Sequence, residues 1–160
     1  MTLSREIAVA VDRLPEGAAL PCRVDVESGP NRLGLELVAC GPVGLAFNTL
    51  DFAATGGADR GPDDLRAWGD RLAGRLTYLM EPLVLLEVDH LAGEAKLRSK
   101  APTAREDLRS FYEIRLGRAG TLRLRRIAFD GTTRARRAVP CQMTREVLER
   151  LADDLAASAA

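Results

Sequence analysis

Apolar and polar residues alternate with a period of two through the first third of the chain. This alternation is typical of β-strands that bury one face, and it predicts four strands separated by turns at 15–17, 28–31 and 41–42. The first strand is the least regular of the four. The inward residues are, in chain order, Ile7, Val9 and Val11; Val24 and Val26; Leu33, Leu35 and Leu37; and Val43, Leu45 and Phe47.

After residue 61 the apolar residues recur at spacings of three and four, which predicts a helix over about 62–80. Pro62 stands in the first helical turn, followed by Asp63 and Asp64 at the positive end of the helix dipole, and Glu81 and Pro82 end the pattern. The apolar stripe consists of Leu65, Trp68, Leu72, Leu76 and Leu79. Gly69 and Gly74 each cost about 1 kcal/mol of helix propensity unless close packing uses their missing side chains.

A second helix is predicted over about 144–156. Met143 and Thr144 resemble a hydrophobic staple residue followed by an N-cap. Val147, Leu148, Leu151 and Leu155 then recur at helical spacing. We expect residues 156–160 to form a frayed tail, as chain termini commonly do.

The region between the two helices predicts further strands. Residues 83–88 are apolar on both faces and indicate a strand in the middle of a sheet, whereas 94–100 carry one fully charged face. A polar loop over 101–107 precedes strands at 111–116, with Tyr112, Ile114 and Leu116 on one face, and at 121–129.

The strand at 121–129 contains a conflict of register. Leu122 and Leu124 place the buried face at even positions, whereas Ile127 and Phe129 place it at odd ones. One extra residue near 125–126, forming a β-bulge, would resolve the conflict. The pair 130–131 (Asp-Gly) is a signal for a two-residue hairpin turn leading into 132–139.

These elements predict an α+β fold. We expect one domain over 1–160, with a mostly antiparallel sheet of about 7–9 strands and two main helices (about 62–80 and 144–156) packed on it. At 160 residues and 46% hydrophobic content, such a chain buries roughly two-thirds of the surface that its unfolded form exposes.

Cysteine usage and the N-terminus favour a cytoplasmic protein. Cys22, Cys40 and Cys141 are odd in number and widely separated, which is typical of reduced thiols. The segment 1–12 contains charges around a very short apolar run and therefore does not resemble a signal peptide. No later run of residues approaches the length of a membrane span.

Candidate catalytic chemistry is sparse. His90 is the only histidine, and it lies near Glu87, Asp89 and Glu94 at the end of a predicted strand. Their spacing matches no metal motif, so solvated turn residues are the favoured interpretation. Ser28 lacks the glycines of a nucleophile elbow, and the glycines at 56–61 are followed by Asp63 and Asp64, which disfavour phosphate. We therefore predict no catalytic residue, no metal and no cofactor.

Charge is distributed unevenly along a chain whose net charge is zero. Residues 109–137 hold nine arginines against two acids, Glu113 and Asp130, for a net charge of +7, and the remainder sums to −7. A coding sequence rich in G and C would also enrich arginine, but it does not explain this clustering. We predict a partner-binding surface on the late hairpins formed by Arg115, Arg118, Arg123, Arg125, Arg134 and Arg136.

Three functions remain open. The favoured one is a non-enzymatic cytosolic binding or adaptor protein that presents this arginine-rich sheet face to an acidic protein partner or to a second copy of itself. The second is a small-ligand binder with an apolar cavity between Leu148, Leu151 and a curved sheet. The third is nucleic-acid binding through the same arginines, with Phe111 stacking on a base. Against the two readings that use the arginines, carboxylates on the helices offer partners within the chain or between subunits: Asp63, Asp64, Asp70, Glu146, Glu149, Asp153 and Asp154.

Overall fold

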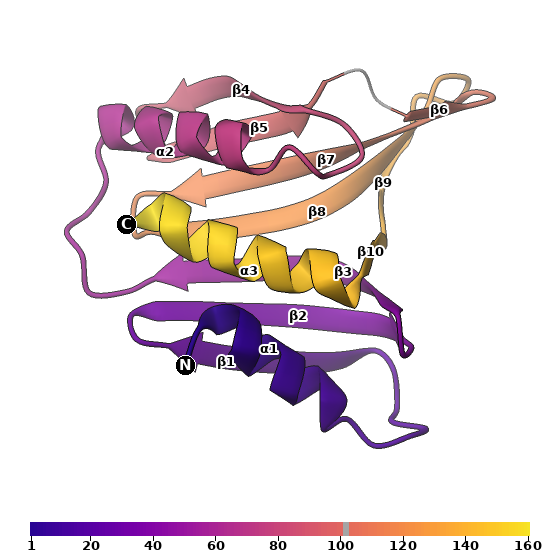
Figure 1. The fold of residues 1–160 in the computed structure, drawn as a ribbon. Coiled ribbons are helices and arrows are strands. Elements are labelled where there is room, and N and C mark those ends of the chain that lie inside the picture. Colours follow the sequence, from indigo (N-terminus) through magenta and orange to yellow (C-terminus); the bar gives the residue numbers. More distant parts are fainter. Residues whose placement is uncertain (101–102) are drawn as a thin grey trace.

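Three helices lie on one face of a ten-stranded antiparallel sheet in the computed structural model, which describes residues 1–100 and 103–160 (Figure 1). The predicted α+β class is confirmed, with one more helix and more strands than expected. The elements are α1 (Leu3–Asp12), β1 (Cys22–Ser28), β2 (Asn31–Cys40), β3 (Gly44–Ala54), α2 (Pro62–Arg75), β4 (Leu83–Asp89), β5 (Glu94–Ser99), β6 (Thr103–Arg105), β7 (Leu108–Gly117), β8 (Thr121–Asp130), β9 (Arg136–Val139), β10 (Cys141–Thr144) and α3 (Arg145–Ala159).

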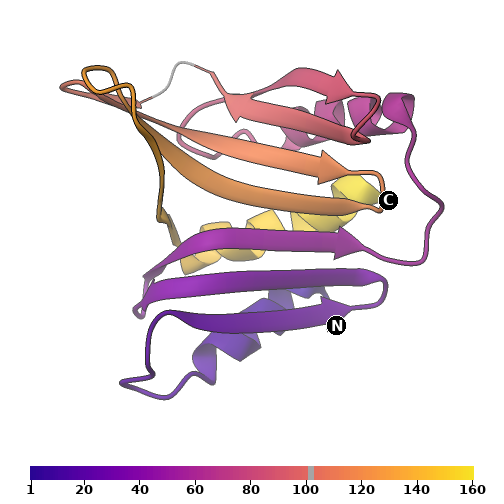
Figure 2. The same ribbon diagram turned by 180° about the vertical axis from the view of Figure 1, so that it is seen from behind.

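The main strand order is β1-β2-β3-β8-β7-β5-β4, and the short strands β10, β6 and β9 pair with β3, β7 and β8. All three helices cover the same face, which we call the inner face. The opposite face, called the open face, carries no helix (Figure 2). The joined ends of β6, β7, β8 and β9 extend beyond the helices.

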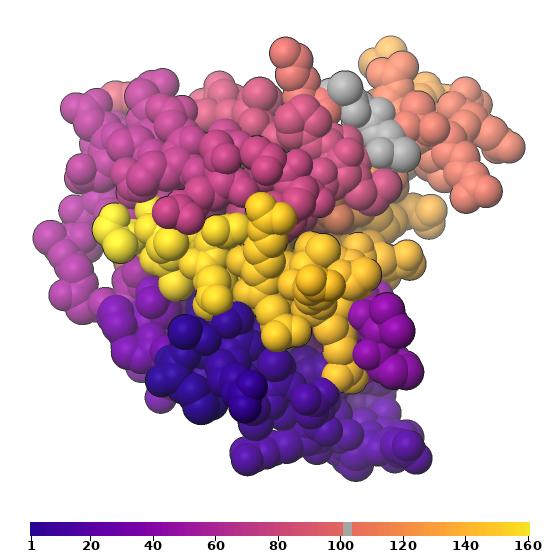
Figure 3. Space-filling view, viewed as in Figure 1, coloured from indigo at the N-terminus to yellow at the C-terminus, as the bar shows by residue number. Residues whose placement is uncertain are grey.

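One hydrophobic core fills the space between the inner face and the helices. The three helices lie side by side over the sheet, with α3 between α1 and α2 (Figure 3). Leu35, Leu50 and Leu97 from the sheet, and Trp68 and Leu151 from the helices, are completely buried there. The alternation in β1 and β2 therefore predicted the buried face correctly.

The N-terminal segment is helix α1, so the prediction of a strand there is wrong. Leu3, Ile7 and Val11 are buried and follow one another at spacings of four, while Val9 is only half-buried. Thr2 caps the helix, its side chain accepting a hydrogen bond from the backbone N–H of Arg5. The short apolar run is compatible with both periods, and packing against α3 and β1 decides in favour of the helix.

Both predicted helices end elsewhere than expected. Helix α2 stops at Arg75, before the predicted end near 80, although Leu79 is still buried. Helix α3 continues to Ala159, so the expected frayed tail is wrong. Trp68 Nε1 donates to Ser158 Oγ at 3.1 Å, and the guanidinium group of Arg71 donates to the Ser158 carbonyl at 2.8 Å. These contacts fix the last turn and satisfy one of its free carbonyls.

Strand β4 lies at the edge of the sheet, where the sequence predicted a central strand. It pairs with β5, and α2 covers its inner side. A Cβ atom at Gly69 would lie 3.1 Å from Leu85 Cδ1, so the missing side chain does allow close packing of α2 on β4. Gly74 has nothing near it and gains no such packing. A register shift between Leu85 and Glu87 leaves Leu86 exposed.

The predicted bulge near 125–126 does not form. Strands β7 and β8 pair without interruption from Leu108 opposite Asp130 to Gly117 opposite Thr121. The inner face continues from Leu124 to Arg126, which is buried, and Ile127 lies on the open face. Arg126 is accommodated on the inner face by an ion pair with the buried Glu81, so the strand needs no shift of register.

The turns near the tip of the sheet are also wider than predicted. Residues 131–135 form the loop after β8, closed by the backbone N–H of Asp130 donating to the Ala135 carbonyl. The Asp130 carboxylate accepts from the backbone amides of Thr132 and Thr133. Of the predicted polar loop over 101–107, residues 101–102 lie outside the described residues, and 103–105 form β6 instead.

Candidate functional site

The open face contains a row of residues that crosses seven strands. Each member is the register partner of the next, and the row begins at β1 and ends at β4. Its members are Asp25, Gly34, Asp51, Arg123, Arg115, Lys96 and Glu87. Three cations thus stand directly beside one another on β8, β7 and β5. Like charges in directly opposed positions destabilise a sheet.

The neighbouring row adds two more cations around one acid. Arg125, Glu113 and Arg98 are register partners on β8, β7 and β5, and Arg136 reaches the same acid from β9. We call this set the cationic block. It consists of Lys96, Arg98, Arg115, Arg123, Arg125 and Arg136 around Glu113, and its formal charge is +5. With Asp51, which pairs with Arg123, and Glu87, which lies opposite Lys96, the charge is +3.

Glu113 is the centre of the block. Its side chain is 1% exposed, and its two carboxylate oxygens lie 2.9 Å from Arg115 Nε, 3.2 Å from Arg125 Nη2, 3.3 Å from Arg136 Nη2 and 3.9 Å from Lys96 Nζ. Burial by itself raises the pKa of Glu113. Hydrogen bonds from Arg115 and Arg125, together with the charge of Lys96, outweigh burial and hold the pKa below its ordinary value.

One carboxylate cannot neutralise four cations, so positive charge remains at the surface of the block. Arg115, Arg125 and Arg136 keep 49%, 35% and 47% of their side-chain surface exposed. Arg123 is 59% exposed and pairs at 2.7 Å with Asp51, which Arg23 shares at 3.1 Å. The cations therefore remain available to an anionic group from outside.

Four of the six predicted site residues meet in the block, namely Arg115, Arg123, Arg125 and Arg136. Arg118 lies in the β7–β8 turn, where its Nη2 donates to the Ala92 carbonyl. Arg134 lies in the loop after β8 with a φ of 62°, in the left-handed region. These two residues belong to turns and lie outside the block.

Sequence reasoning missed Lys96, Arg98 and the role of Glu113. The alternation over 94–100 already placed Lys96 and Arg98 on a charged face, but only the register of β5 against β7 puts that face beside Glu113. The alternative that these arginines pair with acids on the helices is not what the structure has: they pair with Glu113 and Asp51, and the helices cover the other face (Figures 1 and 2). Asp154, for example, pairs with Arg75 from its own side of the sheet.

The aromatic side chains do not offer a surface for stacking on bases. Phe111 lies on the open face but is only 5% exposed, because the guanidinium groups of Arg98 and Arg136 lie 4.2 and 5.7 Å from its ring centre. All seven aromatic residues fall within the described ranges, and none is exposed. The cation–π contacts hold the arginines in place over Phe111.

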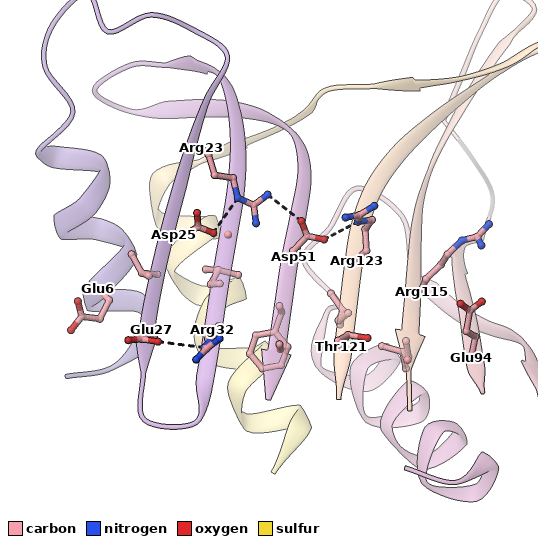
Figure 4. A pocket seen from close by; sticks show the side chains of 18 residues that line it. Glu6, Arg23, Asp25, Glu27, Arg32, Asp51, Glu94, Arg115, Thr121 and Arg123 are labelled. Atoms are coloured by element: carbon pink, nitrogen blue, oxygen red, sulfur yellow. Dashed lines mark hydrogen bonds and ion pairs between the residues drawn. The ribbon is translucent and has the colours of Figure 1, made fainter. Parts of the chain in front are cut away.

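A hollow of about 1020 Å³ lies beside the block on the open face (Figure 4). Small residues form part of its floor: Gly34, Ala53, Gly117 and Thr121. The guanidinium group of Arg23 lies across β2 at Gly34, where a Cβ atom would overlap Arg23 Nη2 and Asp25 Oδ1. The missing side chain at this position lets Arg23 reach Asp51.

The apolar cavity near Leu148 and the acidic residues around His90 are weaker candidate sites. Leu148 and Leu151 belong to the continuous core, and the hollow next to Leu148 measures about 60 Å³, well below the size of a typical ligand pocket. His90 is exposed, and Asp89 accepts from the backbone amides of Leu91 and Ala92 in the turn after β4.

Residues 1–100 and 103–160 contain no cluster of three or more His, Cys, Asp or Glu side chains suited to holding a metal ion. The three cysteines are free. Within the same ranges, no helix is both long and apolar enough to cross a membrane. Comparison with protein-family models, with curated proteins and with solved structures finds no match to this chain.

Proposed function

We propose that this chain is a non-enzymatic binding or adaptor protein that presents the cationic block to an acidic protein partner. The observation that carries the proposal is the group of six cations around the buried Glu113 on a sheet face that no helix covers; it keeps a formal charge of +3 when the neighbouring acids Asp51 and Glu87 are counted. Opposite charge across an interface speeds encounter and selects among partners. Arginine suits this role because its planar guanidinium group can hold a carboxylate with two hydrogen bonds.

The arrangement of the block favours carboxylates over nucleobases. Glu113 already shows how the block holds a carboxylate, with Arg115, Arg125 and Arg136 donating to its two oxygens. Nucleic-acid surfaces of comparable charge usually add exposed aromatic side chains for stacking. Here Phe111 lies beneath arginines.

The test measures the binding of a fluorescein-labelled twelve-residue polyglutamate peptide by fluorescence anisotropy at low salt. Arg115→Gln/Arg123→Gln removes two exposed cations of the block, and we expect it to weaken binding about tenfold, a loss of about 1.4 kcal/mol. The matched control is Arg13→Gln/Arg66→Gln, which removes the same charge from two exposed arginines on α1's end and on α2. We expect the control to change affinity less than twofold.

Three outcomes would overturn the proposal. The first is an absence of binding by the wild-type chain, and the second is an equal loss in the two double variants. The third is tighter binding of a labelled single-stranded oligonucleotide of equal charge, which would indicate that the block binds nucleic acid. Sedimentation of the wild type and of Arg115→Gln/Arg123→Gln separates a foreign partner from a second copy, because a dimer formed through the block would dissociate in the variant.

A further inference from the structure

The two edges of the sheet differ in the side chains that they carry. Within residues 1–100 and 103–160, β1 and β4 each pair with a strand on one side only (Figure 1). An unpaired strand edge can pair with another chain, and proteins commonly blunt such edges with charged side chains. In β1, charged residues occupy alternate positions, namely Arg23, Asp25 and Glu27. In β4, residues 83–86 are all apolar, and the strand contains no basic residue.

Exposed apolar side chains accompany the edge formed by β4. Leu86, at the register shift of the strand, is half exposed to solvent. Met80, shortly before β4, and Leu91, in the turn after it, are also exposed. Three of the seven large apolar side chains that the described residues expose therefore stand in or next to this one strand. Such a grouping is typical of a surface that contacts another protein.

The flank of α2 next to this edge carries one cation and one acid. Arg71 and Arg75 on α2 reach toward α3, donating to the Ser158 carbonyl and to Asp154. At about 100° per residue, Arg66 and Asp70 lie on the opposite flank, which faces outward past β4. Both are exposed, and neither forms an ion pair with any other described residue.

The charges of β4 favour antiparallel pairing with a second copy of the same strand. Antiparallel pairing about a twofold axis near Leu86 places Glu87 and Asp89 of each copy opposite the apolar residues 83–86 of the other. Parallel pairing would instead place acid opposite acid, which destabilises a sheet.

The same axis makes the exposed charges of α2 complementary. Gly69 packs on Leu85, and α2 and β4 run in opposite directions (Figure 1). Leu86 lies one residue further along β4, a step of about 3.3 Å, which corresponds to about two residues back along α2. The axis therefore passes near the midpoint between Arg66 and Asp70. It brings Arg66 of each copy beside Asp70 of the other, so two ion pairs form.

The two copies of α2 also have room beside each other. Helix α2 lies over both β4 and β5. After the edges join, the two helices would therefore lie about two strand spacings apart, or about 10 Å. This is close to the usual distance between packed helices.

We infer that the chain forms a dimer in which the β4 strands of two copies pair antiparallel and join the two sheets into one. The twofold axis stands perpendicular to the joined sheet, so the two open faces lie on the same side and both cationic blocks stay uncovered. The inference does not depend on the proposed function. It adds that the protein presents two blocks together.

Sedimentation velocity of the full chain at micromolar concentrations tests the dimer, and we expect the wild type to have twice the mass of one chain. Leu86→Asp adds an acid beside Glu87 in both copies at the axis, and we expect it to weaken the dimer at least about tenfold. Val43→Asp adds the same charge at an exposed residue between β2 and β3 and is the matched control, which should leave the dimer unchanged. Circular dichroism checks that both variants are folded.

Charge reversal on α2 tests the antiparallel arrangement. Arg66→Asp and Asp70→Arg each bring like charges together across the axis, so each variant alone should self-associate about tenfold more weakly than the wild type. An equimolar mixture of the two variants should form a heterodimer of about wild-type stability, because the two acids of one chain then face the two arginines of the other. Loss of folding in either variant could not be rescued in this way.

A wild-type chain that stays monomeric would overturn the inference. A dimer that Leu86→Asp leaves intact, or that Arg115→Gln/Arg123→Gln dissociates, would overturn it as well. A mixture of the two α2 variants that stays monomeric would overturn the antiparallel arrangement.

Peptide binding distinguishes this inference from the proposed function. Arg66 lies on the helix side of the sheet, so Arg66→Asp should leave polyglutamate affinity unchanged. A wild-type monomer that binds polyglutamate would overturn the dimer alone. A dimer that does not bind the peptide would overturn the proposed function alone.

Discussion

Arg125 and Arg126 are neighbours in β8, yet they lie in two different electrostatic settings. Arg126 points to the inner face, where its side chain is 8% exposed and its two terminal nitrogens each lie 3.3 Å from a carboxylate oxygen of Glu81. Arg125 points to the open face, is 35% exposed, and shares the carboxylate of Glu113 with three other cations.

The inner pair connects the segment after α2 to the sheet. Glu81 also accepts a hydrogen bond from Ser99 Oγ at 2.8 Å, and Ser99 Oγ accepts one from the backbone N–H of Tyr112. The guanidinium group of Arg126 lies 4.5 Å from the centre of the Tyr112 ring. Here one cation pairs with one acid within a buried hydrogen-bonded network, and such a network serves to hold the fold together.

The comparison teaches that the ratio of cations to acids, and not arginine content, distinguishes structure from a candidate site. Around Glu81 the charges balance, whereas around Glu113 they do not. A surface group with more cations than acids can bind an added anion favourably. A buried pair of one cation and one acid has no charge left to do so. Substitutions at Glu81 and Arg126 should therefore change mainly the stability of the fold, and substitutions around Glu113 mainly the binding of anions.

The largest expected effect follows from breaking the inner pair. Arg126→Met leaves the Glu81 charge buried without its guanidinium partner, and we expect the free energy of unfolding to fall by about 3–5 kcal/mol. Urea denaturation measures this, and polyglutamate affinity should stay unchanged. Arg126→Met/Glu81→Leu should recover much of the loss. A loss below about 1 kcal/mol in the single variant would show that the pair is not structural.

A smaller loss of stability, with a gain of binding, is expected at the outer acid. Glu113→Gln removes the charge held by four cations, and we expect unfolding free energy to fall by about 1–3 kcal/mol, since these cations, unlike Arg126, can turn to water. Polyglutamate affinity should rise severalfold because the block gains one net positive charge. Urea denaturation and anisotropy test the two effects, and unchanged or weaker binding would contradict the idea of an unbalanced block.

The stabilising contribution of Glu113 should disappear in acid. Because its pKa is lowered in the folded chain, its contribution is fully present above the unfolded value of about 4.3 and is lost as the pH falls through the lower folded value. The wild type and Glu113→Gln should therefore differ at pH 7 and converge as the pH falls below the unfolded pKa and through the folded one. Urea denaturation over this range measures the gap, and a constant gap would disprove the linkage.

The smallest effect is expected at the floor of the hollow. Gly34→Ala places a Cβ atom where the Arg23 guanidinium group now lies, but that flexible side chain can rotate away, so we expect a loss of about 1 kcal/mol or less. In an Arg23→Ala background the same substitution should cost less, because only the Asp25 carboxylate then lies close to the added Cβ atom. Denaturation of the four proteins forms a double-mutant cycle, and equal costs in both backgrounds would remove Arg23 as the cause.

The sequence predicted β1, β2 and the N-cap of α3 correctly, whereas the strand predicted at residues 7–11 is part of helix α1. Thr144 caps α3 as expected, its side chain accepting from the backbone N–H of Val147, because capping depends on residues three apart. The positions of β1 and β2 followed from local alternation. The edge position of β4 could not be predicted, because the apolar pattern indicates which faces of a strand are covered and not how many strands pair with its backbone.

The candidate site was predicted only in part, for a similar reason. The cluster of arginines over 109–137 is visible in the sequence, and alternation places Arg123 and Arg125 on one face. Their acid, Glu113, comes from β7, and Lys96 from β5. Cross-strand neighbours depend on register, which local pattern does not determine when a buried charge such as Arg126 interrupts the apolar face.

By itself the sequence determined the α+β class, the period of most elements and the excess of arginine in one segment, because these properties depend on residues close together in the chain. The tertiary structure alone decided that residues 3–12 are helical, that all three helices cover one face, and which arginines share an acid. Those outcomes depend on long-range packing and strand pairing, where free energy is gained only when distant segments meet.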